Sequence, residues 1–85
     1  MAVTIDVVLK KKPRFGKKPW KEVARRDNAP IQTEPSVDAM QDRFGTIVGG
    51  HEASDGSDQS WEFVQPDPTD EGMSVMTSVT LRRIP

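Results

Sequence analysis

Apolar and polar residues alternate near both ends of the chain, and this alternation limits the possible folds more than any other feature. The first stretch has Val3, Ile5, Val7 and Leu9 at every second position, and the second has Met73, Val75, Thr77, Val79 and Leu81. Because successive side chains of a strand point to opposite faces, we predict strands over residues 3–10 and 73–81, packed in the same sheet. The other face should be solvated, so we expect Thr4→Asp to be mild.

Weaker patterns between these strands predict shorter elements. Residues 45–49 and 60–65 have the composition of short strands. The acidic residues 52–60 are predicted to form a loop with a tight turn at Asp55-Gly56, and residues 66–72 a second turn region.

Two short helices are also predicted. Ser36 is a suitable N-cap for a helix that places Val37, Met40 and Phe44 at helical spacing and ends before Gly45. A second helix is predicted from Pro19 to Arg26, since its apolar residues share one helical face. Together these elements predict a mainly β or small α+β fold: an antiparallel sheet of about four strands, or an open small barrel, with one or two short helices and an extended basic arm.

The supply of core-forming residues is small. Val, Ile, Leu and Phe number 18 of 85 residues, and the chain has no cysteine with which to form a disulfide. We therefore expect residues 1–85 to form a single small domain that is weakly folded or self-associating when isolated, and that depends on a partner for its stability.

Charge is segregated along the chain although the net charge is only −1. Residues 1–26 contain nine Lys or Arg and two acidic residues, whereas residues 27–72 contain eleven acidic residues and one Arg. Opposite charge blocks of this kind suit docking between subunits.

The basic block includes a segment broken by prolines, residues 10–30, which we expect to be an extended arm. Its predicted partner-binding residues are Lys11, Lys12, Arg14, Phe15, Lys17, Lys18 and Trp20. Cations interleaved with aromatic rings could bind an acidic protein surface, could bind nucleic acid through phosphates and bases, or could simply be solvated. Contact with protein is the interpretation we favour, because the acidic block would repel a phosphate backbone.

The acidic block and the single histidine have further interpretations. Its carboxylates could imitate a phosphate backbone, as in a phage-encoded inhibitor of a nucleic-acid-binding protein, or they could only keep loops solvated. His51 lies near acidic residues, which is compatible with a solvated loop, a weak divalent-ion site or catalysis; we favour the loop. We predict no catalytic residue, no metal site and no cofactor.

The sequence contains no apolar run long enough for a membrane span and no pattern of a signal peptide. We therefore expect a soluble protein without a membrane partner, located in the cytoplasm or in a virion. The predicted function is that of a non-enzymatic accessory subunit of a larger assembly, most specifically a virion protein that decorates a capsid or joins head to tail. Its partners would be protein subunits, including copies of itself. The alternatives are a small nucleic-acid-binding module that uses the basic arm and an acidic phage-encoded inhibitor of a nucleic-acid-binding protein.

Overall fold

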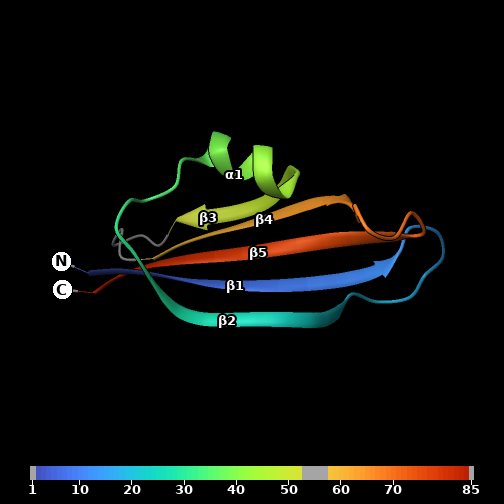
Figure 1. Cartoon of the computed structure of the whole chain (residues 1–85), viewed down its shortest axis with the longest axis horizontal. Coiled ribbons are helices and arrows are strands. Elements are labelled where there is room, and N and C mark those ends of the chain that lie inside the picture. Colours follow the sequence, from blue (N-terminus) through green and yellow to red (C-terminus); the bar gives the residue numbers. More distant parts are fainter. Residues whose placement is uncertain (1, 53–57, 85) are drawn as a thin grey trace.

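The computed structural model describes residues 2–52 and 58–84, which form a five-stranded antiparallel sheet and one helix. The strands are β1 (Ala2–Pro13), β2 (Lys21–Ile31), β3 (Thr46–Glu52), β4 (Asp58–Pro66) and β5 (Met73–Ile84), and the helix is α1 (Val37–Phe44). Their order across the sheet is β2-β1-β5-β4-β3 (Figure 1). The predicted mainly β fold is confirmed, with five strands in place of about four.

The two strands predicted from alternation lie next to each other at the centre of the sheet. They pair antiparallel over their full lengths, with Ile5 opposite Leu81 and Val7 opposite Val79. The two apolar rows therefore lie on the same face of the sheet. Both strands and their pairing are confirmed.

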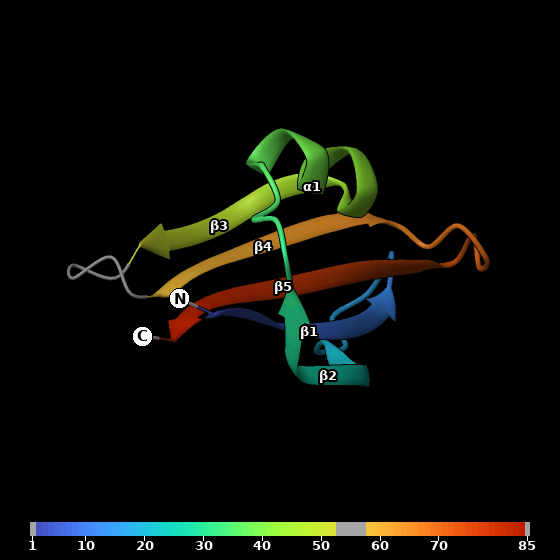
Figure 2. The ribbon, with the colours of Figure 1, turned by 60° about the vertical axis from the view of Figure 1, so that its left-hand side comes forward.

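Helix α1 packs on this apolar face, over the half of the sheet that contains β3 and β4 (Figure 2). Met40 from α1 forms a buried cluster with Phe63 from β4 and Val79 from β5, and Phe44 and Trp61 pack against it. Within the described chain the buried hydrophobic residues are Met40, Phe63, Val75, Val79 and Leu81. This core is small, in keeping with the composition.

The opposite face of the central strands is not uniformly solvated. Thr4 is only 9% exposed, and it lies between Pro30 of β2 and Arg82 of β5. The expectation that Thr4→Asp is mild therefore no longer holds, because a carboxylate there would lose much of its hydration.

The predicted helix at residues 37–44 is confirmed together with both of its caps. Ser36 has extended backbone geometry, and its Oγ accepts a hydrogen bond from the Ala39 N–H at 3.1 Å. At the other end the Gly45 N–H donates to the Gln41 carbonyl oxygen at 2.9 Å. These local bonds define an eight-residue helix that would be too short to persist without packing.

Gly45 should be difficult to replace, because both its backbone angle and its surroundings favour glycine. Its φ is +106°, and an added Cβ would lie 2.6 Å from the Cβ of Gln65. We expect Gly45→Ala to lower the free energy of unfolding by about 2 kcal/mol or more, measured by urea denaturation. Gly16→Ala is the matched control, since Gly16 has φ +109° but nothing within 4 Å of the added Cβ. Equal losses of stability in the two variants would contradict a steric contribution at Gly45.

The helix predicted from Pro19 to Arg26 is wrong. Residues 21–31 instead form β2, an edge strand of the sheet that is paired with β1. Most of β2 is exposed, and its register with β1 shifts at two points, so regular alternation is lost.

Most of the predicted basic arm is also part of the sheet. Residues 10–13 continue β1 and residues 21–30 belong to β2, which leaves residues 14–20 as the loop of a β-hairpin. The loop is at the right-hand end of the molecule in Figure 1. The arm is therefore a hairpin held by strand pairing, and only its tip lies outside regular structure.

One register shift in this hairpin is stabilised by Asp6. The Asp6 carboxylate accepts a hydrogen bond from the backbone N–H of Asn28 at 2.8 Å and another from Arg82 at 2.9 Å. Asn28 has a φ of +56°, a conformation that asparagine tolerates better than most residues. The hydrogen bond from Asn28, followed by that from Arg82, lowers the pKa of Asp6.

Candidate protein-binding surface

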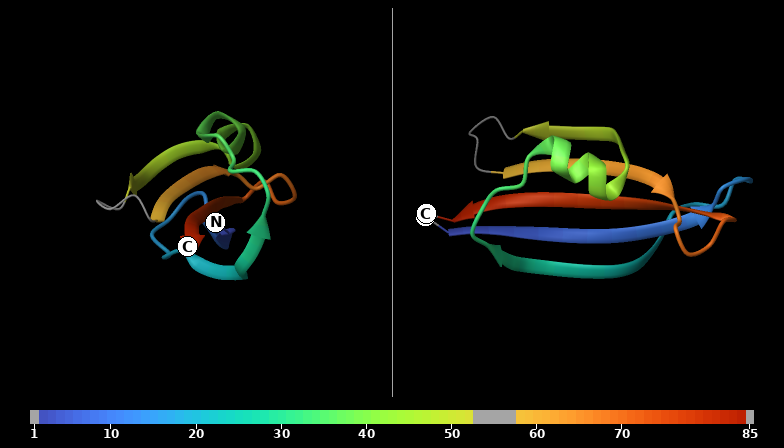
Figure 3. Two further views of the ribbon diagram at one scale, coloured as in Figure 1. Left: turned by 90° about the vertical axis from the view of Figure 1, so that its left-hand side faces the viewer. Right: turned by 45° about the horizontal axis from the view of Figure 1, so that its top comes forward.

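The basic hairpin loop, residues 14–20, lies at one end of an elongated molecule that measures 43 × 23 × 22 Å. The turn between β4 and β5 lies beside it (Figures 1 and 3). The Arg14 N–H donates to the Gly72 carbonyl oxygen at 2.9 Å, and the Arg14 guanidinium reaches the Glu71 carbonyl oxygen at 3.5 Å. The start of the loop is thereby attached to the neighbouring turn.

A buried carboxylate fixes the base of the loop. The side chain of Asp67 is 2% exposed and lies 2.6 Å from Lys11 Nζ. It also accepts hydrogen bonds from the Thr69 N–H at 2.9 Å and the Thr69 hydroxyl at 2.8 Å. The Lys11 ammonium, followed by the two bonds from Thr69, lowers the pKa of Asp67 to about 2. Lys11, predicted to bind a partner, therefore has an internal partner.

This ion pair should make stability depend on pH in the acid range. The pKa of Asp67 is lower in the folded chain than its ordinary value of 3.8, so its stabilising effect is full above about pH 4. That effect should be lost as the pH falls towards 2. We expect the urea midpoint of the wild type to drop more over this range than that of Asp67→Asn, measured by circular dichroism. Parallel pH profiles for the two proteins would contradict the role of Asp67.

The other predicted site residues differ in their exposure to solvent. Lys12 Nζ lies 5.1 Å from the centroid of the half-buried Trp20 ring. Phe15 is 85% exposed, and the Arg14 guanidinium lies 5.8 Å from the centroid of its ring. Residues 17 and 18 are exposed lysines at the loop tip. The loop thus presents one uncovered aromatic ring among several cations.

A shallow hollow of about 760 Å³ lies next to the loop. Its lining residues are Lys11, Pro13, Lys18, Pro19, Trp20, Lys21, Glu22 and Met73. Three of these eight, Lys11, Lys18 and Trp20, are predicted from the sequence, whereas the prolines, Lys21, Glu22 and Met73 are not. Met73 comes from β5, so nothing in the local composition of the basic segment indicates it.

The acidic residues do not lie on one element. Asp38 belongs to α1, Glu62 to β4 and Asp70 to the β4–β5 turn. Several are neutralised internally: Asp27 pairs with Arg25, Glu34 with Arg83, Asp58 with Arg82 and Asp67 with Lys11. This distribution gives little support to a continuous phosphate-like row.

The predicted turn at Asp55-Gly56 lies outside the described residues. The backbone of His51 is part of β3, which continues further than the predicted strand over residues 45–49. Within residues 2–52 and 58–84, no three His, Cys, Asp or Glu side chains are grouped so that they could hold a metal ion. The helix of the described chain is also too short and too polar to cross a membrane.

Comparisons with protein families, with curated proteins and with solved structures find no match to this chain.

Proposed function

We propose that this chain is a non-enzymatic subunit of a larger assembly and that it docks onto a partner protein through the basic hairpin loop. The observation that carries the proposal is the exposure of Phe15, which is 85%. Exposed aromatic rings flanked by cations are typical anchors of protein interfaces. Burial of Phe15 in a partner's apolar pocket would remove this ring from water.

The attachment of the loop also supports docking. The Lys11–Asp67 ion pair and the backbone bond from Arg14 to Gly72 hold its base before any partner arrives. A loop that is already ordered loses less conformational entropy on binding. The partner surface should be acidic and should contain an apolar pocket for Phe15, because Lys17 and Lys18 are exposed beside it.

The most specific form of the proposal is a virion protein that decorates or stabilises a capsid, or joins head to tail. Its support is the small core, together with the exposed cations of the basic hairpin loop, which suit contact with an acidic subunit. Nucleic acid is the alternative occupant of the same loop. Trp20 is less suited to base stacking than its sequence context implies, since it is half-buried and Lys12 lies over its ring.

Gradient sedimentation of a lysate from the native source tests this proposal. The 9.5 kDa chain should sediment with a much larger particle, and nuclease treatment should not release it. Phe15→Ala should return the chain to the top of the gradient, whereas Val37→Ala, a change of an exposed valine on α1, should not. Release by nuclease would favour nucleic acid, and a wild-type chain that stays at the top would overturn the proposal.

A further inference from the structure

The apolar face of the sheet is only half covered. α1 buries Met40, Phe63 and Val79, but Ile5, Val7 and Leu9 of β1 remain partly exposed on the same face. The views in Figures 2 and 3 show α1 over the β3–β4 side, with β2 at the other edge of the sheet. Between them, the described residues cover the β1 floor only in part.

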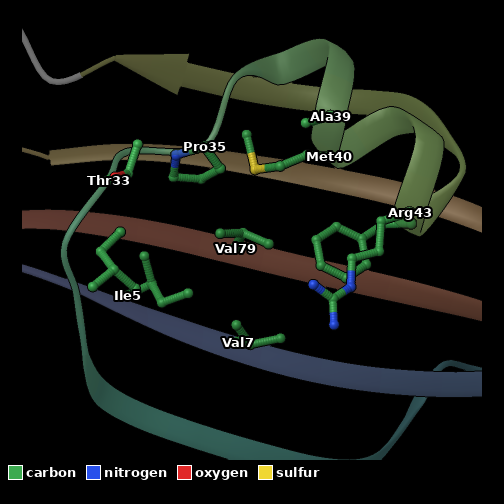
Figure 4. Close-up of a pocket in the computed structure, with 10 residues that line it drawn as sticks. Ile5, Val7, Thr33, Pro35, Ala39, Met40, Arg43 and Val79 are labelled. Carbon is green, nitrogen blue, oxygen red and sulfur yellow. The ribbon is translucent and has the colours of Figure 1, made fainter.

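This uncovered strip is a groove with two walls. Two hollows of about 210 and 360 Å³ share Ile5, Val7, Arg43 and Phe44 in their linings, so they form one continuous depression. α1 forms one wall (Figure 4). β2 forms the other, with small side chains at Ala24 and Ala29. We call this depression the α1–β2 groove. It shares no lining residue with the hollow beside Trp20.

The charged residues that line the groove are all basic. Its described lining includes Arg25, Arg26 and Arg43 and contains no Asp or Glu. Arg25 pairs with Glu22 at 2.7 Å. Within the described chain, neither Arg26, which lies opposite Val7 in the register, nor Arg43 forms an ion pair. The Arg43 guanidinium lies 5.8 Å from the centroid of the Phe44 ring. Figure 4 shows Arg43 extending from α1 towards the strands of the floor. The two arginines thus place positive charge at an apolar floor, and acidic groups would complement it.

The shape of the groove indicates what kind of ligand fits. Pockets for small molecules usually enclose most of the ligand surface, whereas this floor is shallow and its β1 side chains are only half-buried. An open groove between a helix and a strand is typical of recognition of a polypeptide segment, in which apolar anchors seat on the floor. Carboxylates flanking those anchors would then meet Arg26 and Arg43.

We infer that the α1–β2 groove binds an acidic amphipathic segment of a partner protein. The apolar side chains of that segment lie on Ile5, Val7 and Leu9, and its Asp or Glu residues pair with Arg26 and Arg43. This surface is separate from the basic hairpin loop, so the inference does not depend on the proposed function.

Selection from a random library of 16-residue peptides on the immobilised, folded protein tests the inference. Recovered peptides should combine Leu, Ile, Val or Phe with Asp or Glu. Their affinity should fall about tenfold or more for Arg26→Glu/Arg43→Glu. A second selection on this charge-reversed protein should recover peptides with Lys or Arg in place of the acidic residues. Heteronuclear NMR spectra of each variant establish that it is folded.

A blocking variant tests the place of binding without altering charge. Ala24→Trp puts a large ring into the groove from an exposed position of β2 and should lower peptide affinity about tenfold or more. Val48→Trp, at a 57% exposed valine outside the groove lining, should leave affinity unchanged, as should Phe15→Ala.

The inference would be overturned by recovery of no peptide, by recovery of peptides without acidic residues, or by equal binding to wild type and Ala24→Trp. A parallel NMR titration with dodecanoate tests whether the groove binds a small apolar molecule instead. If dodecanoate shifts the Ile5 and Val7 resonances but no peptide does, the inference is also overturned.

Discussion

Val79→Lys is expected to unfold the protein. Val79 is 2% exposed and contributes to the buried cluster with Met40 and Phe63. A lysine there would place an ammonium group without a partner in the centre of a small core, at an expected loss of about 4 kcal/mol or more. A domain of this size has a free energy of unfolding on the order of 5 kcal/mol, so most molecules should lose their native structure. Far-ultraviolet circular dichroism and a urea titration measure the result.

Ser78→Lys is the matched control for this prediction. It introduces the same side chain one residue earlier on β5, where it points to the other face of the sheet. Ser78 lies opposite Glu62 of β4, which is exposed and has the opposite charge. The expected loss is below about 1 kcal/mol. If both variants melt alike, the assignment of the two faces of β5 is wrong.

The sequence predicts well those elements whose signals are local. Residues 36–45 contain a cap, a helical apolar pattern and a terminal glycine, and each part has its expected place in α1. β1 and β5 are long, and apolar and polar residues alternate regularly along them because one face of each strand is apolar. This alternation is why both strands are predicted correctly.

β2 could not be predicted in this way. Its side chains are mostly exposed, so the period of two that marks a half-buried strand is weak. The register shifts between Ile5 and Val7 and between Leu9 and Lys10 weaken it further. Its assignment to the sheet depends on pairing with β1, which is a tertiary interaction.

In the candidate site too, some features follow from local sequence and others depend on tertiary contacts. Composition identifies a basic segment that contains the loop and its two aromatic residues. The role of Lys11, however, depends on Asp67, which follows 56 residues later in the sequence. Likewise, alternation predicts that Ile5 and Val7 share an apolar face, yet it does not indicate how far α1 covers that face. The α1–β2 groove lies where α1, placed over the β3–β4 side, leaves β1 partly uncovered, so it becomes visible only when the helix is placed on the sheet.

Substitutions in the basic hairpin loop should distinguish an apolar anchor from binding to phosphate. With the particle that co-sediments with the chain as binding partner, Phe15→Ala/Trp20→Ala should weaken binding by a few kcal/mol, or on the order of 100-fold. Lys17→Gln/Lys18→Gln should chiefly slow association and reduce its dependence on salt. Lys11 is left unchanged in both variants because its ion pair with Asp67 supports the loop.

Dissociation constants for the two variants, measured at two salt concentrations, separate the interpretations. Docking onto protein predicts that the aromatic variant binds more weakly than the lysine variant and that its defect persists at high salt, since an apolar interface is not screened. Binding to nucleic acid predicts the reverse: the lysine variant should have the larger defect, and the slope of log affinity against log salt should flatten by roughly one unit for each phosphate that the variant no longer neutralises. Val37→Ala controls for the removal of an exposed apolar side chain elsewhere on the surface. Wild-type affinity in both loop variants would show that the loop is only solvated, because neither its exposed ring nor its cations would then contribute to binding.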